Sequence, residues 1–159
     1  MGYTTDFWGE VAIDPPLNAE EIKFLQAFNE TRRMDRTRGP YYVDGSGDFG
    51  QGRDPDIRDF NRAPAGQPSL WCNWTVDAEG SMIQWDGGEK FYSAGEWMIY
   101  IIDHFLRPGA IAKNDLPFLQ ANHVCNGVIN AQGEAHDDRW RIVVEDNHVQ
   151  IEQASVTWA

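Results

Sequence analysis

The segment from Glu96 to Arg107 constrains this chain most, because the helix that it predicts is apolar over nearly its whole circumference. Its polar side chains form one narrow stripe of Glu96, Tyr100, Asp103 and Arg107. Ser93 stands three residues before Glu96, which predicts a capping box at the start of the helix. A helix of this kind is buried on most sides, so other elements must cover it.

Hydrophobic periodicity predicts the remaining elements. Residues 7–14 alternate as a strand does, and Asn18 with Glu21 predicts a capping box for a helix that reaches about Arg32. Further strands are indicated at 70–76, "MIQW", "VCNGVINAQ", "RWRIVVE" and "VQIEQASV", the last two flanking an Asp146–Asn147 turn.

This order of elements predicts an α+β fold, in which two helices cover one face of a mostly antiparallel sheet. A ferredoxin-like plait with an added C-terminal β-hairpin is the arrangement that we expect. The length of 159 residues predicts a single domain, 1–159, with enough buried surface to need no disulfide.

A long irregular loop, rich in Arg and Gly, is predicted at about 33–69. Residues 31–69 hold seven of the thirteen basic residues and carry a net charge of +1, whereas the rest of the chain carries −13. Such a loop can fold back onto the acidic body through ion pairs. Alternatively it is exposed and engages an anionic ligand or a partner, since irregular segments of this length are often functional.

The stretch "GSGDFG", residues 45–50, matches the glycine pattern of a dinucleotide-binding turn, but its context does not. Asp44 and Asp48 would repel phosphate, and Pro55 follows where a helix should begin. A calcium-binding repeat is matched by one partial copy, with Asp56 where an apolar residue belongs. We therefore predict no cofactor and no metal.

The seven tryptophans are the more informative feature. Trp71 and Trp74 point to opposite faces of their predicted strand, so one enters the core and the other is exposed or covered by the loop. An exposed Trp beside Asn73 and Asp86 could stack on a sugar or a base, or anchor a protein. The expected ligand- or partner-binding residues are Arg53, Arg58, Trp71, Asn73, Trp85 and Asp86.

These features favour a non-catalytic binding protein of the inhibitor, immunity or ligand-sequestering type, with a protein partner or a small-molecule ligand. A small metal-assisted or acid–base hydrolase is the alternative, and it would use Glu134, His136 and Asp137 of "GEAHDD". That stretch also has the composition of an ordinary turn. A structural component of a phage or other particle is a third possibility.

The net charge of −12 disfavours direct electrostatic binding of nucleic acid and of anionic membranes. Cys72 and Cys125 are too few for a disulfide scaffold, and neither belongs to a C-x-x-C pair. The N-terminus has no signal-peptide pattern, and the longest apolar run, residues 97–102, is too short to span a bilayer. We expect a cytoplasmic protein, whose oligomeric state the sequence leaves open.

Four stretches, "GQPSLWCNW", "WDGGEKFY", "HFLRPGA" and "NGVINAQGEAHDDRWRIVVEDNHV", resemble a family of small acidic proteins of bacteria and their phages. The resemblance covers most of the chain and implies a stand-alone, phage-linked or mobile cytoplasmic protein. It carries no activity and no catalytic residues over to this sequence.

Overall fold

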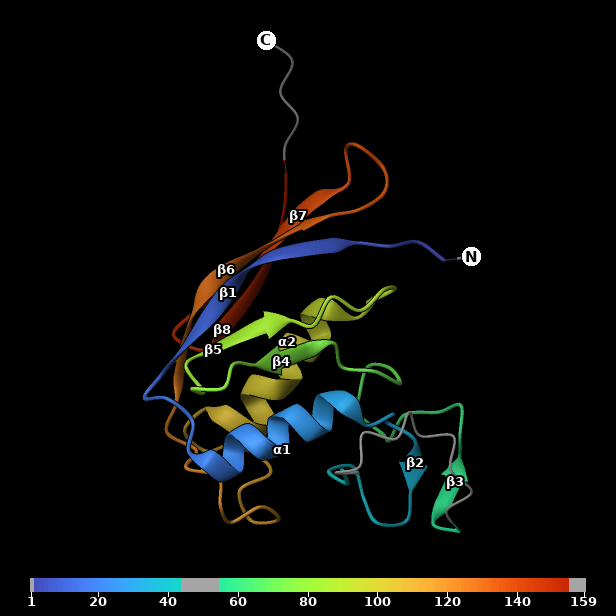
Figure 1. Cartoon of the computed structure of the whole chain (residues 1–159), viewed down its shortest axis with the longest axis vertical. Helices are drawn as coiled ribbons and strands as arrows, with labels where there is room; N and C mark the ends of the chain where they lie inside the picture. Colours follow the sequence, from blue (N-terminus) through green and yellow to red (C-terminus); the bar gives the residue numbers. More distant parts are fainter. Residues whose placement is uncertain (1, 44–54, 155–159) are drawn as a thin grey trace.

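A six-stranded antiparallel sheet forms the body of the protein, with the strand order β4-β5-β1-β6-β7-β8 (Figure 1). The computed structural model describes residues 2–43 and 55–154. The predicted α+β class with an antiparallel sheet is confirmed. The strands of this sheet are β1 (Asp6–Asp14), β4 (Trp74–Val76), β5 (Met82–Trp85), β6 (Val124–Gln132), β7 (Arg139–Glu145) and β8 (His148–Gln153).

One face of the sheet is buried and the other faces solvent. In β1, Phe7, Val11 and Ile13 are buried, whereas Trp8 on the opposite face is 54% exposed. The helix α1 (Ala19–Glu30) packs against β4, and α2 (Ala94–Ile101) packs against β4 and β8. The hydrophobic core therefore lies between the helices and this face of the sheet.

The two helices begin differently. The predicted capping box of α1 is present, since Asn18 Oδ1 accepts from Glu21 N at 2.8 Å and Glu21 Oε1 accepts from Asn18 N at 2.9 Å. The capping box predicted at Ser93 is wrong, because the Ser93 side chain makes no capping bond. Its backbone (φ −108°, ψ 40°) lacks the extended conformation that places a capping side chain over the first turn.

The α2 helix continues as a π-helical turn, η1 (Ile102–Leu106), and its polar stripe differs from the predicted one. Tyr100 is 6% exposed, whereas Ile99 is 43% exposed. The Tyr100 ring stacks on His104 with ring centroids 3.8 Å apart, and its hydroxyl accepts from Gln67. Tyr100 is therefore buried because the segment after β3 covers it and satisfies its polar atom.

The predicted strand at 70–76 starts only at Trp74. Trp74 is paired with Trp85, the last residue of β5, so residues before Trp74 have no partner strand in that ladder. These residues instead lead from the loop into the sheet. β7 and β8 pair around Asp146 and Asn147, which have φ values of 48° and 71°.

The described part of the 33–69 loop contains a short ladder, β2 (Asp35–Arg36) with β3 (Ile57–Asp59). Its arginines pair with acids of the loop itself, as in Arg36–Asp56 at 3.2 Å and Arg58–Asp35 at 3.7 Å. The sequence suggests ion pairs between this loop and the acidic rest of the chain, whereas these ion pairs lie within the loop. The stretch "GSGDFG" and Arg53 lie outside the described residues.

Arg33 attaches this loop to the helical layer. Its side chain is 2% exposed, its guanidinium lies 4.1 Å from the centroid of the Phe28 ring, and it donates to the Tyr42 carbonyl oxygen. Burial lowers the pKa of Arg33 to about 10. A cation held by a ring and a carbonyl fixes the loop against α1.

Glu21 and His123 form an ion pair whose two side chains have no solvent exposure. His123 Nε2 lies 2.9 Å from Glu21 Oε2, and His123 Nδ1 lies 2.6 Å from the carbonyl oxygen of Pro15. A carbonyl and a carboxylate can only accept, so both ring nitrogens donate and His123 is an imidazolium. Glu21 also accepts from the backbone N–H groups of Asn18 and Gln120.

These contacts set the pKa values of the pair. Burial alone would lower the pKa of His123, but the Glu21 and Pro15 acceptors raise it above its ordinary 6.5. Burial alone would raise the pKa of Glu21, but the hydrogen bonds that it accepts lower it below its ordinary 4.5. Both charges are therefore favoured in the folded protein.

Within residues 2–43 and 55–154, no helix has the length and apolar character needed to cross a membrane.

We expect the free energy of unfolding to decrease as pH rises through the raised pKa of His123. The contribution of His123 is complete below about 6.5, the unfolded value, and that of Glu21 is complete above about 4.5. Urea denaturation at pH values from about 4.5 to about 9 measures the change in the free energy of unfolding.

His123→Gln should be less stable by about 3–5 kcal/mol near neutral pH, because it leaves the Glu21 carboxylate buried without its cation. In this variant the free energy of unfolding should also no longer decrease as pH rises above 6.5. His136→Gln, at an exposed histidine, is the matched control and should keep that decrease. A wild-type stability that stays constant over this range would contradict the assignment.

Candidate functional site

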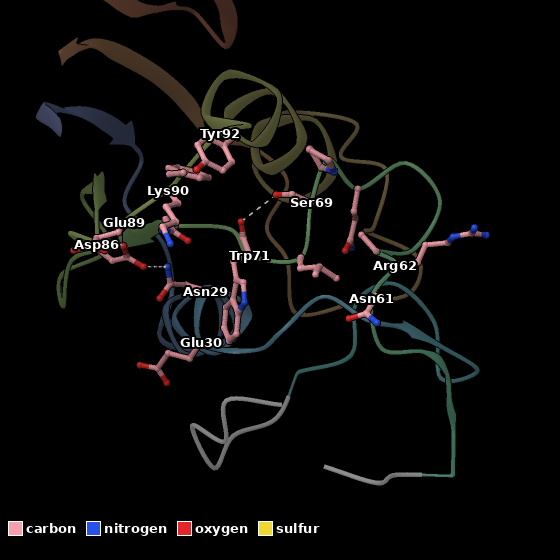
Figure 2. A pocket seen from close by; sticks show the side chains of 17 residues that line it. Asn29, Glu30, Asn61, Arg62, Ser69, Trp71, Asp86, Glu89, Lys90 and Tyr92 are labelled. Carbon is pink, nitrogen blue, oxygen red and sulfur yellow. Dashed lines mark hydrogen bonds between the residues drawn. The ribbon is translucent and has the colours of Figure 1, made fainter. Parts of the chain in front are cut away.

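A cleft of about 1140 Å³ opens beside the C-terminal end of α1 (Figure 2). Its walls come from the last turn of α1, from residues 61–71 that lead out of the loop, and from residues 86–92 between β5 and α2. The three segments are distant in sequence. The cleft therefore exists only because the sheet and α1 bring them together.

Trp71 lies in this cleft between the α1 wall and the loop wall (Figure 2). It is half-buried, and its indole has no hydrogen bond or ring contact with any described residue. Other tryptophans donate their indole N–H groups within the protein: Trp74 to Ala94 O, Trp85 to Gly88 O and Trp97 to Ser69 Oγ. Trp71 thus presents to the cleft an aromatic ring and an N–H that no described residue contacts.

Asn29 and Asp86 form the polar wall. Asn29 Nδ2 donates to Asp86 Oδ2 at 2.8 Å and to the carbonyl oxygen of Cys72 at 2.8 Å, and lies 3.2 Å from that of Trp74. Asp86 Oδ1 accepts from Gly88 N at 2.7 Å. Asn29 therefore satisfies carbonyl groups at the sheet edge, where β4 has no further strand, and holds Asp86 in place.

Charged side chains surround the entrance. Glu30, Asp86 and Glu89 carry negative charge, and Lys90 and Arg62 carry positive charge. Glu30 and Glu89 form no ion pair with any residue that the structure describes. The cleft thus combines a flat aromatic group with carboxylates that pair with no described residue, an arrangement suited to binding a ligand with apolar and hydrogen-bonding parts.

The structure brings Trp71, Asn73 and Asp86 together in this cleft, as three of the residues expected from the sequence. Trp85 is half-buried beside it and does not line it, while its N–H donates to Gly88. Arg58 lies in β3, away from the cleft lining, and pairs with Asp35. Arg53 lies outside the described residues.

Sequence reasoning missed the helical side of the cleft, Asn29 and Glu30, and the Glu89–Tyr92 side. Asn29 stands out in the sequence only as part of a glycosylation pattern, Asn29-Glu30-Thr31. Tyr92 is 65% exposed. No sequence signal shows that the last turn of α1 faces the segment after β5, because the sheet register decides that contact.

The alternative hydrolase residues, Glu134, His136 and Asp137, lie on the exposed turn between β6 and β7. Glu134 Oε1 accepts from Thr4 N at 2.8 Å. His123 lies at the opposite end of β6, just before its first residue, and its side chain is paired with Glu21. In the described ranges, no three His, Cys, Asp or Glu side chains are placed to hold a metal ion.

No family model matches this chain, and neither a curated protein nor a solved structure matches it.

Asn29→Ala should lower the free energy of unfolding by about 1–3 kcal/mol, because carbonyl groups at the β4 edge and the Asp86 carboxylate lose a shared donor. Chemical denaturation measures the change. The neighbouring Glu30→Ala is the control, since Glu30 is exposed and has no partner among the described residues. Equal stability of the two variants would show that the Asn29 contacts contribute nothing.

Proposed function

We propose that this protein is a non-catalytic binding protein, which holds a small molecule or a segment of a partner protein in the cleft around Trp71. An inhibitor, an immunity factor or a ligand-sequestering protein would work in this way. The observation that carries the proposal is the Trp71 indole, which has no partner among the described residues and lies in a cleft of about 1140 Å³. Tryptophans in such pockets are frequent anchors of binding.

The fixed polar wall gives further support. Asp86 is held by Asn29 and Gly88 N before any ligand arrives, so little ordering is needed on binding. The hydrolase alternative has no such support, because a reaction needs convergent groups in a cleft and Glu134, His136 and Asp137 lie on an exposed turn.

We also infer a ferredoxin-like plait with an added C-terminal hairpin. The sheet order supports it, because β5 lies between β1 and β4, while β1 lies between β5 and β6. The two βαβ units are thereby interleaved. β7 and β8 would then extend the β6 edge of the plait. A cytoplasmic location remains a prediction from the sequence, and a phage-linked role is a prediction that rests on the sequence resemblance alone.

A thermal-shift panel of small molecules and mass spectrometry of pull-downs together test the proposal. Trp71→Ala should weaken a ligand found in this way by about 30-fold, since an anchoring tryptophan contributes about 2 kcal/mol or more. Titration calorimetry measures that loss.

Trp8→Ala is the matched control, because Trp8 is exposed on the other face of the sheet and should leave affinity unchanged. The proposal fails if both screens are empty. It also fails if every ligand that is found binds the Trp71 and Trp8 variants with the affinity of the wild type.

A further inference from the structure

Gln67 lines the cleft and is 8% exposed. Its Nε2 donates to the Pro40 carbonyl oxygen at 2.7 Å and to the Tyr100 hydroxyl at 3.0 Å, which fixes the orientation of the amide. Its Oε1 has no partner among the described residues. This oxygen is itself buried, so it offers no direct contact to a ligand in the cleft.

The charges of the cleft favour a cation. Glu30 and Glu89 are unpaired among the described residues, and Asp86 adds a third carboxylate. Of the two basic side chains, Arg62 lies 4.0 Å from the Asp59 carboxylate outside the cleft lining, and Lys90 has no ion pair among the described residues. Three acids and two bases leave the lining with a net charge of −1. The whole chain carries −12, so its field attracts cations and repels anions.

The ring of Trp71 supplies the surface on which a flat cation can lie. Three arginines among the described residues already lie over aromatic rings: Arg33 over Phe28 at 4.1 Å, and Arg36 and Arg38 over Tyr42 at 4.2 and 5.2 Å. Trp71 has no such partner among the described residues. Tryptophan is the aromatic side chain that attracts a cation most strongly.

We propose that the cleft recognises a guanidinium group, the side chain of an arginine in a partner peptide, stacked on Trp71. This inference rests on the proposed function and names its ligand class. A guanidinium matches the site because it is flat, weakly hydrated and carries five N–H donors in a fan. The carboxylates of Glu30 and Glu89 neutralise it. An ammonium group is compact and strongly hydrated, so it fits the flat ring less well.

Titration of the ¹⁵N-labelled protein with capped Gly-Arg-Gly tests the inference directly. The matched ligands are capped Gly-citrulline-Gly, which has nearly the same shape without the charge, and capped Gly-Lys-Gly. The arginine peptide should shift the Trp71 indole N–H resonance and bind at least about fivefold more tightly than either of the others. Salt should weaken it. No shift by about 10 mM peptide, or equal binding of the three peptides, overturns the inference.

Removal of the cleft charges gives the second measurement. Glu30→Gln with Glu89→Gln should reduce affinity for the arginine peptide by about tenfold and leave affinity for the citrulline peptide unchanged. Glu10→Gln with Glu145→Gln removes the same charge from exposed positions on β1 and β7. An equal loss in both double variants would assign the attraction to the overall charge and overturn the inference.

The two proposals fail in distinguishable ways. A neutral ligand that binds through Trp71, while the arginine peptide does not bind, overturns the guanidinium inference and keeps the binding function. Arginine-peptide binding that Trp71→Ala leaves intact overturns the inference as well. Empty ligand and partner screens together with no peptide binding overturn both.

Discussion

The buried ion pair of Glu21 and His123 is the interaction on which the arrangement of layers depends. It joins the first turn of α1 to the chain that enters β6, and the His123 Nδ1–H reaches the Pro15 carbonyl just after β1. Three segments at one end of the sheet are therefore fixed by one pair of charges. Such a pair is costly to bury, and removal of either partner leaves an uncompensated buried charge. The pair therefore favours the one relative position of helix and sheet in which the two side chains meet.

That position determines the cleft. Once the N-terminal end of α1 is fixed, its last turn runs alongside the β4 edge, where Asn29 donates to Cys72 O and Asp86. The same contacts cover an edge that would otherwise expose backbone carbonyls. The contacts that protect this sheet edge thus also build the polar wall of the cleft. Trp71 faces this wall because the β4 ladder starts only at Trp74.

Local pattern predicted the elements where the hydrophobic signal was strong. The capping box of α1, the alternation of β1 and the order of the main strands and helices follow from residue spacing. Ser93 shows the limit of such local patterns. It has the spacing to Glu96 of a capping box, but its side chain makes no capping hydrogen bond. Tyr100 shows another, since tertiary packing buried a residue of the polar stripe against Gln67 and His104.

The sequence by itself determined the α+β class, the nearly all-apolar second helix and the prominence of Trp71, Asn73 and Asp86, because periodicity and composition act over short stretches of chain. Only the tertiary structure decided that Asn29, Glu30 and Gln67 join them, and that Arg58 does not. The physical reason is that a cleft between segments dozens of residues apart depends on strand register and on a buried charge pair. Neither leaves a pattern in the neighbouring residues.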